Sequence, residues 1–322
     1  MNKTDRFALV LALAGLLLML AVNHWLSARP SAAQQPEMLA QRDGYVLSAV
    51  QLLSPGETHA YPMSALSQGT LLYVGEEKPL SPDLPAQQAR DVRSLVGRYL
   101  NAAEHVALAE EAIYALCSLV REHPMRQILI AEGMRSPWEQ AALQAAVFAE
   151  YQSTMPVRQA LQQAAADVPD TGKSEHQLAF AFDVQLTGAL DWSQPDPMAR
   201  SEEGQWLLEN GWHYGFIRRY PPERIDLTGV NNEALHWRYV GAAHAAALHT
   251  ADWCLEEYLQ ALHAYGTLCL QDPQGRQTWL CCVPLEGEQA FFPVPAGWQV
   301  LSVSADNLGY AVAVMKEADQ SS

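Results

Sequence analysis

Positive charge is scarce in this 322-residue chain, which has 20 lysine and arginine residues, 36 aspartate and glutamate residues and a formal net charge of −16. No run of basic residues is present that could displace counterions from a polyanion, so the sequence argues against nucleic-acid binding. Any anionic ligand must be held by a few individually placed cations. Only 17% of the residues are charged and 49% are hydrophobic, which is typical of a folded protein with a large core.

Cysteine is also rare, and its positions exclude one class of metal site. The residues are Cys117, Cys254, Cys269, Cys281 and Cys282. They have no CxxC spacing and are odd in number, so they form neither a thiolate zinc site nor a completely paired disulfide framework.

A single long apolar run stands near the N-terminus. Residues 7–22, FALVLALAGLLLMLAV, are 16 uncharged residues that follow Lys3 and Arg6. This length lies between that of a signal-peptide core and that of a membrane-spanning helix, and Trp25 can extend the run to the membrane interface. We interpret residues 1–30 as an uncleaved membrane anchor that leaves the rest of the chain outside the cytoplasm. The alternative is secretion after signal cleavage.

The rest of the chain divides into segments of different pattern. Residues 31–80 begin with an Ala-, Gln-, Pro- and Ser-rich stretch and are interpreted as a stalk and lead-in, with short strand-like pieces such as TLLYVG. Residues 81–265 mix helical and strand patterns, which predicts an α+β domain with a small mixed or antiparallel sheet and flanking helices. Residues 266–322 alternate like short strands between turns and predict a small β-rich appendage.

Apolar spacing within the central domain predicts helices over residues 86–102 and 104–122, followed by a strand over residues 126–133. A further helix is expected over residues 157–166.

The segment after the predicted strand carries a complete signal for the start of a helix. Ser136 is expected to be the N-cap, Pro137 the first helical residue, and Glu139 the residue that closes a capping box. Arg135 therefore lies between the end of a strand and a capped helix, on rigid backbone.

Large and small residues alternate over residues 174–186, SEHQLAFAFDVQL, which predicts a strand with one face of large and one face of small side chains. Asp183 lies on the face of small side chains, and His176 lies just before the strand. The two can approach one point if the chain turns at His176. Taken singly, each is more often a hydrogen-bonded structural residue than a ligand.

A second strand is predicted within residues 231–241, NNEALHWRYVG, with His236 and Arg238 on one face. Glu233 stands three residues before His236. A catalytic zinc ion takes nitrogen and oxygen ligands and leaves one position to water.

His176, Asp183 and His236 supply three such ligands. Glu233 is the candidate to take a proton from water and pass it to a leaving amine. The alternative is that His236 simply packs among aromatic residues.

The order of these motifs is similar to that of the VanY-type D-alanyl-D-alanine carboxypeptidases, zinc peptidases of the M15 family. A pattern close to SxHxxGxAxD is met by Ser174, His176, Ala181 and Asp183. The sequences WLLENGWHYGFIRRYP and ExxHWRYVG follow it, and EGMRSPWEQ upstream resembles the SGYRSxxEQ segment of the family. The resemblance covers about residues 105 to 265.

The resemblance implies a site and a substrate. It implies zinc held by His176, Asp183 and His236, a general base at Glu233, and substrate contacts from Arg135 and Ser174. The implied reaction removes the terminal D-Ala from a peptidoglycan stem peptide that ends in D-Ala-D-Ala. The sequence leaves the oligomeric state undetermined.

Three departures from the family pattern bear on rate and specificity. Ala179 stands where the family usually has Gly and is expected to crowd the strand face by a methyl group. Ala234 and Leu235 replace Pro-Trp, and Glu132 replaces a Ser near Arg135. Alternative functions are therefore a peptidoglycan endopeptidase, an L,D-peptidase, or a pseudoenzyme that binds stem peptides without cleaving them.

Overall fold

The structure is a computed structural model that describes residues 36–51, 56–84, 87–96, 100–230 and 233–318. The expected membrane anchor over residues 1–30 lies outside these ranges. Within them, no helix has the length and apolar character needed to cross a bilayer. All five cysteines are described, and none of them is part of a disulfide.

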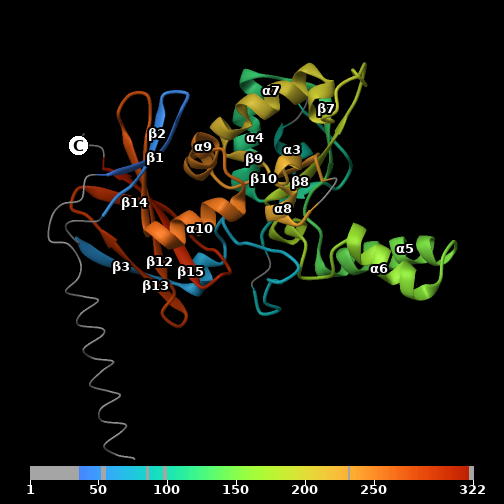
Figure 1. The fold of residues 1–322 in the computed structure, drawn as a ribbon, viewed down its shortest axis with the longest axis horizontal. Helices are drawn as coiled ribbons and strands as arrows, with labels where there is room; N and C mark the ends of the chain where they lie inside the picture. Colours follow the sequence, from blue (N-terminus) through green and yellow to red (C-terminus); the bar gives the residue numbers. More distant parts are fainter. Residues whose placement is uncertain (1–35, 52–55, 85–86, 97–99, 231–232, 319–322) are drawn as a thin grey trace, which may run out of the picture.

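The chain forms a β-rich lobe from its two ends and an α/β lobe from its middle (Figure 1). The strands at the centre of the α/β lobe are β5 (Leu100–Ala102), β7 (Met125–Glu132), β8 (Ala181–Leu186), β9 (Phe216–Arg218) and β10 (His236–Tyr239). They form a five-stranded sheet in the order β5-β7-β8-β10-β9. The β5–β7 pair is parallel and the other pairs are antiparallel. The predicted α+β class with a small mixed sheet is confirmed.

One face of this sheet is covered by α4 (Glu110–Glu122) and α7 (Glu202–Asn210). Leu116 of α4 and Leu207 of α7 belong to the same buried hydrophobic cluster as Phe182 and Val184 of β8. Since successive strand residues point to opposite faces, this packing directs Asp183 of β8 away from the cluster. The sheet core therefore determines the direction of the carboxylate that was predicted as a ligand.

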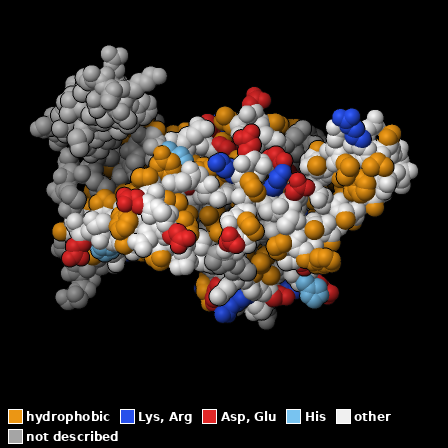
Figure 2. Space-filling model, turned by 90° about the horizontal axis from the view of Figure 1, so that it is seen from below, with side chains coloured by type: hydrophobic (Ala, Val, Ile, Leu, Met, Phe, Trp, Pro, Cys, Tyr) orange, Lys and Arg blue, Asp and Glu red, His pale blue; other side chains and the backbone are white. Residues whose placement is uncertain are grey.

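Two helices, α5 (Pro137–Gln152) and α6 (Val157–Asp167), pack on each other in an arm that projects from the α/β lobe (Figure 1). The predicted capping box is present: the Glu139 backbone N–H donates to Ser136 Oγ at 3.2 Å, and the Ser136 N–H donates to Glu139 Oε2 at 2.7 Å. Hydrophobic side chains, including Leu161 and Trp138, are exposed on the arm, which is seen at the right in Figure 2.

The β-rich lobe contains a six-stranded sheet in the order β1-β2-β11-β12-β15-β14 and a separate β3–β13 pair. The strands are β1 (Glu37–Arg42), β2 (Tyr45–Ala49), β3 (Glu57–Pro62), β11 (Thr267–Gln271), β12 (Gln277–Pro284), β13 (Gln289–Val294), β14 (Trp298–Ala305) and β15 (Tyr310–Glu317). Two helices, α9 (Ala242–Ala251) and α10 (Leu255–Tyr265), share a buried cluster with Leu268 and Leu280 of this sheet.

Strands β1, β2 and β3, which lie within residues 31–80, belong to the β-rich lobe rather than to a stalk. Strand β2 pairs with β11, with Ala49 opposite Leu268, and β3 pairs with β13. The expected appendage over residues 266–322 is thus completed by strands from the other end of the chain. The TLLYVG segment is turn and irregular chain apart from a bridge between Gly75 and Lys78.

Two predicted elements are shorter than expected. Among the described residues of the range 86–102, only α3 (Arg93–Val96) is helical, and Leu100–Ala102 pairs with β7 as β5. Pairing with a distant strand here overrides local helical spacing. The helix expected over residues 104–122 begins at Glu110, as α4.

The remaining elements are short. They are α2 (Met63–Leu66), α8 (Ile225–Thr228), β4 (Arg90–Asp91), β6 (Ala107–Leu108), and the 3-10 helices η2 (Glu175–Leu178), η3 (Met198–Arg200), η4 (Gly211–Tyr214) and η5 (Pro222–Arg224).

Candidate metal and catalytic site

Pairing of β8 with β10 brings two of the predicted ligands, Asp183 and His236, together. Asp183 lies directly opposite His236 in the register, and Asp183 Oδ1 is 2.8 Å from His236 Nδ1. His236 and Arg238 share one face of β10, as predicted, while Trp237 points to the other face and belongs to the sheet core. The antiparallel register therefore forms this half of the site.

His176 reaches the same point from η2, not from a strand. The predicted strand over residues 174–186 begins only at Ala181, because the chain makes a 3-10 turn and then passes through Ala179 with φ +61°. His176 Nε2 lies 3.2 Å from Asp183 Oδ2. The turn at His176 considered in the sequence analysis is therefore present.

Ala179 follows η2 and is not part of the strand face that it was expected to crowd. Its φ of +61° is in the left-handed region, where a Cβ is unfavourable and glycine is preferred. The family's glycine at this position therefore corresponds to a backbone requirement, which Ala179 meets at some cost in strain.

Gly133 fixes the orientation of the His176 ring. The carbonyl oxygen of Gly133 lies 2.6 Å from His176 Nδ1, so Nδ1–H donates to it and Nε2 is free for a ligand. A Cβ on Gly133 would lie 2.5 Å from the carbonyl oxygen of Ala107. Only glycine, which has no Cβ, lets the chain after β7 pass this close to the backbone of Ala107.

The ligand atoms of His176, Asp183 and His236 all lie within 4.8 Å of one another, and they are the only such group of three among the described residues. Two imidazoles and a carboxylate are ligands that zinc accepts in catalytic sites. Both histidines are buried, at 3% and 4% exposure. This donor set fits a zinc ion.

The electrostatics of the cluster keep the Asp183 carboxylate ionised. Burial by itself would raise the pKa of Asp183, but hydrogen bonds from His176 and His236 outweigh it and hold that pKa below its ordinary value. Burial would lower the pKa of His236, whereas hydrogen bonds to Asp183 and Glu175 raise it to about 9. The carboxylate is thus held in its charged form among positively polarised partners.

Glu233 lies beside this cluster, at the start of β10. Its backbone oxygen accepts the N–H of His236 at 3.1 Å. Burial raises the pKa of the Glu233 carboxyl, while the nearby charges of His236, His176 and Arg135 act to lower it. A carboxyl group whose pKa is moved toward neutral pH is suited to exchange protons with a reacting molecule.

Arg135 is held from three directions. Its backbone N–H donates to the carbonyl oxygen of His176 at 3.1 Å, and its Nη1 donates to Gln140 Oε1 at 2.9 Å. Its Nε lies 3.6 Å from Glu132 Oε1, so the acidic replacement noted in the sequence does contact the arginine. Glu139 is engaged in the capping box. Nε itself is buried and has no hydrogen-bond partner among the described residues.

Ser174 is buried as the N-cap of η2, where its Oγ accepts the backbone N–H of His176 at 3.4 Å. This contact supports the turn that carries His176. Its predicted contact with substrate stays a prediction.

The sequence analysis missed Glu175, Arg219 and Arg238 as a group. Glu175 Oε1 accepts from Arg219 Nε at 2.8 Å and from Arg238 Nη1 at 2.5 Å, and its Oε2 lies 3.3 Å from His236 Nε2. No local signal marked Glu175, because an acidic residue next to a histidine in the sequence is ordinarily solvated.

Three histidines outside the cluster pack against aromatic residues. His213 and His249 stack on Trp212, with ring centroids 3.6 and 4.1 Å away. His244 Nδ1 lies 2.6 Å from the Tyr258 hydroxyl. These contacts give the three histidines packing roles away from the proposed ligands.

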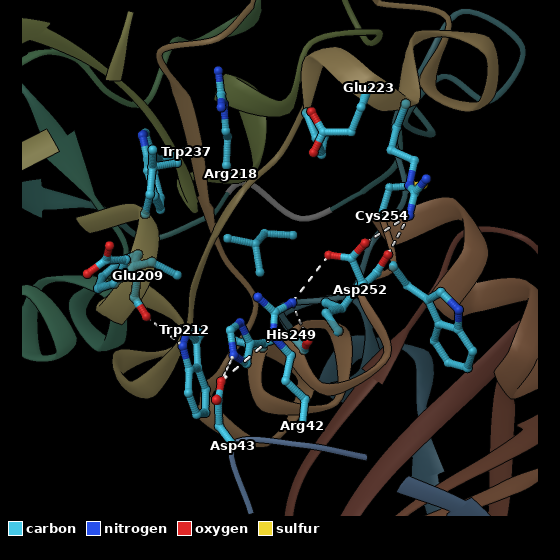
Figure 3. Close-up of a pocket in the computed structure, with 18 residues that line it drawn as sticks. Arg42, Asp43, Glu209, Trp212, Arg218, Glu223, Trp237, His249, Asp252 and Cys254 are labelled. Atoms are coloured by element: carbon cyan, nitrogen blue, oxygen red, sulfur yellow. Dashed lines mark hydrogen bonds and ion pairs between the residues drawn. The ribbon is translucent and has the colours of Figure 1, made fainter. Parts of the chain in front are cut away.

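A cavity of about 390 Å³ lies on the side of β10 that Trp237 faces, and its lining includes Trp212, Arg218 and Asp252 (Figure 3). None of the predicted site residues lines it. Its charged groups are largely paired with one another, as in the contact of Arg42 Nη1 with Asp252 Oδ1 at 3.3 Å. The cavity is therefore separate from the cluster of proposed ligands.

Comparisons with known proteins agree with the geometry. The VanY family model, described as D-alanyl-D-alanine carboxypeptidase, matches residues 105–242. A D-alanyl-D-alanine carboxypeptidase of Enterococcus faecalis is 38% identical over 132 residues, which are 41% of this chain and 47% of that protein. A protein of the same description from Enterococcus faecium is 28% identical over 207 residues, which are 62% of this chain and 61% of that protein.

The chain thus spans between 47% and 61% of the length of these curated relatives. The crystal structure of the vancomycin-resistance D,D-dipeptidase VanXYg in complex with a D-Ala-D-Ala phosphinate analog is similar to this fold. The TM-score is 0.61 at 21% identity, with 81% of this chain and 99% of that chain covered. All the predicted site residues fall inside the part that the family model matches. Residues 105–242 are therefore similar to the VanY family, whose model is described as D-alanyl-D-alanine carboxypeptidase.

Proposed function

We propose that this chain is a zinc-dependent D,D-carboxypeptidase that removes the terminal D-Ala from peptidoglycan stem peptides ending in D-Ala-D-Ala. The observation that carries the proposal is the meeting of His176, Asp183 and His236 at one point, with Glu233 beside them. All four lie within the matched VanY segment. A binding protein without catalytic activity would have no need of the base.

The zinc ion would be held by His176, Asp183 and His236. The chemistry that it supplies when bound is Lewis acidity, which polarises a carbonyl group and makes water a better nucleophile. Glu233 takes a proton from the attacking water and delivers it to the departing amine of D-Ala. Its raised pKa favours both transfers, because a carboxyl group that titrates nearer to the reaction pH is present in both protonation states during turnover.

Arg135 positions the peptide. Its guanidinium is held by Gln140 and lies close enough to Glu233 for the arginine charge to lower the pKa of that carboxyl. A planar guanidinium can bind a terminal carboxylate through two parallel hydrogen bonds or brace the oxygen on which negative charge develops. The contact with Glu132 reduces the net charge presented to substrate, so we propose that Arg135 acts mainly through directed hydrogen bonds.

The test uses the full chain, purified in detergent and loaded with zinc. Release of D-Ala is measured from a stem pentapeptide ending in D-Ala-D-Ala, a tetrapeptide ending in a single D-Ala, and a cross-linked dimer. We expect release from the pentapeptide alone. Preference for the tetrapeptide would indicate an L,D-peptidase, and cleavage of the cross-link an endopeptidase. Zinc-independent binding of the pentapeptide without cleavage would indicate a pseudoenzyme and overturn the proposal.

We also propose that the enzyme acts outside the cytoplasm, tethered by residues 1–30. The support is the 16-residue apolar run at 7–22 behind Lys3 and Arg6. Protease added to intact cells should then remove the catalytic domain. Protection until lysis, or release of the domain into the medium, would contradict the tether.

A further inference from the structure

A buried cluster of charges lies behind the proposed metal site. Glu175 is 3% exposed, Arg219 is 1% exposed and Arg238 is fully buried. Burying a carboxylate and two guanidinium groups is costly unless each is closely paired, so the arrangement requires a reason. None of these side chains is one of the proposed zinc ligands.

The two oxygens of Glu175 have different partners. Oε1 accepts hydrogen bonds from both arginines, at 2.8 Å from Arg219 Nε and 2.5 Å from Arg238 Nη1. Oε2 is left for His236, whose Nε2 lies 3.3 Å away. Because arginine can only donate, the pair of arginines fixes which oxygen faces them and which faces the histidine.

The arginines themselves are anchored on separate parts of the chain. Arg238 Nη2 donates to the backbone oxygens of Thr70 and Leu72, both at 2.7 Å. Arg219 donates to both carboxylate oxygens of Glu256 on α10, at 2.7 and 3.1 Å. The orientation of the Glu175 carboxylate is therefore set by contacts that reach the neighbouring β-rich lobe and α10.

This orientation decides which nitrogen of His236 would keep its proton when zinc binds. Both ring nitrogens face carboxylate oxygens that can only accept, Nε2 that of Glu175 and Nδ1 that of Asp183 at 2.8 Å. Because Asp183 is itself a proposed ligand and Glu175 is not, Nδ1 is the nitrogen that zinc would take, and Oε2 of Glu175 would hold the proton on Nε2. His176 has the opposite arrangement, because the Gly133 carbonyl engages Nδ1 and leaves Nε2 free.

We propose that Glu175 is a positioning residue that holds His236 in the ring form and orientation needed to bind zinc through Nδ1, with Arg219 and Arg238 fixing the carboxylate. This inference rests on the proposed zinc function. It adds a residue that does not touch substrate or metal, and it explains why two arginines are buried on this face of β10.

Glu175→Gln tests the proposal sharply. The two arginines still require an oxygen, so the amide NH2 is forced toward His236 Nε2. A donor at that position favours the proton on Nδ1, the nitrogen that must be free. Loss of such a partner commonly weakens metal binding about 10- to 100-fold. We expect that loss for the full chain, measured by competition with a chromogenic zinc chelator.

Glu256→Gln is the matched control. Among the described residues Glu256 pairs with Arg219 and makes no hydrogen bond to a proposed zinc ligand, and its side chain is 10% exposed. Both variants remove one carboxylate charge from the arginine cluster, and both should lower the melting temperature. The glutamine oxygen in Glu256→Gln can still accept from Arg219, so the Glu175 carboxylate keeps its orientation, and only Glu175→Gln should weaken zinc binding. Equal zinc affinity in Glu175→Gln and wild type would overturn the proposal.

A measurement on the wild type keeps the test valid if Glu175→Gln does not fold. In long-range ¹H–¹⁵N spectra of histidine-labelled chain, two imidazoles should shift on zinc addition. We expect one to carry its proton on Nδ1 and the other on Nε2. Two zinc-shifted rings that both carry the proton on Nδ1 would overturn the role of Glu175. A wild type that binds no zinc and releases no D-Ala would instead contradict the proposed function itself.

Discussion

Asp183 contacts both histidines of the proposed metal site, with Oδ1 2.8 Å from His236 Nδ1 and Oδ2 3.2 Å from His176 Nε2. The carboxylate thereby marks the nitrogen of each ring that faces the site. The nitrogen on the far side of each ring meets a different acceptor, the backbone oxygen of Gly133 for His176 and the carboxylate of Glu175 for His236. The contacts with Gly133 and Glu175 therefore help to determine which ring nitrogen of each histidine faces the proposed metal site.

Replacing Glu233 with alanine should separate metal binding from turnover. Glu233 is beside the ligands but is not one of the three in the cluster. The variant should keep its zinc, as measured by elemental analysis, while kcat falls about 10²- to 10⁴-fold, the usual contribution of a general base. His236→Ala is the comparison and should lose zinc itself. A near-normal rate in Glu233→Ala would contradict the role of this carboxylate.

Arg135→Lys should impair catalysis without unfolding the protein. Lysine keeps the charge but cannot hold Gln140 and a substrate oxygen with one planar group. We expect kcat/KM to fall about 10²-fold, the scale for losing one preorganised donor, with zinc content and Tm close to those of the wild type.

Arg218→Lys is the control for that variant, because Arg218 forms a bidentate pair with Asp196 at 2.6 and 3.0 Å outside the ligand cluster. It should lower Tm and leave kcat/KM largely unchanged. If Arg135→Lys instead melts much earlier than wild type, or cleaves the pentapeptide equally well, Arg135 has a structural role.

Gly133→Ala should disturb both stability and metal binding. The added Cβ would lie 2.5 Å from the Ala107 carbonyl oxygen and 2.9 Å from Val106 Cγ1, so the backbone must move. Overpacking of this kind costs about 1–3 kcal/mol in the free energy of unfolding. Since the Gly133 oxygen orients His176, zinc affinity should fall as well. Unchanged urea unfolding and chelator competition would show that the site tolerates the shift.

His244 should make the protein less stable in mild acid. Burial lowers the pKa of His244 to about 3, whereas a histidine in the unfolded chain titrates near 6.5. Between about pH 6.5 and 3 this histidine binds a proton in the unfolded chain but not in the folded chain. The free energy of unfolding therefore falls as the pH decreases through this range. The slope is about 1.4 kcal/mol per pH unit, or roughly 2 to 3 kcal/mol lost by about pH 4.5.

His244→Gln, which can still bond to the Tyr258 hydroxyl, removes this titration. Urea unfolding of both proteins between about pH 7 and 4.5 should show the difference between them shifting in favour of the variant as pH falls. Parallel curves would mean that His244 is protonated in the folded state.

Much of the site followed from local sequence. Alternation over 236–239 predicted β10 and put His236 and Arg238 on one face, and the Ser136 capping box predicted where α5 begins. Such features depend on neighbouring residues alone, so they are visible in a single sequence. The order of the motifs also identified the VanY family, since order survives where spacing between motifs changes.

Tertiary structure decided the rest, because it depends on partners far away in the chain. Local spacing could not show that Leu100 joins a strand beside Met125, or that Ala49 pairs with Leu268 and brings the predicted lead-in into a sheet with the C-terminal strands. Nor could it show the role of Glu175. An acidic residue beside a histidine is ordinarily solvated, and only the fold brings Arg219 and Arg238 close enough to keep this one charged, buried and directed at His236.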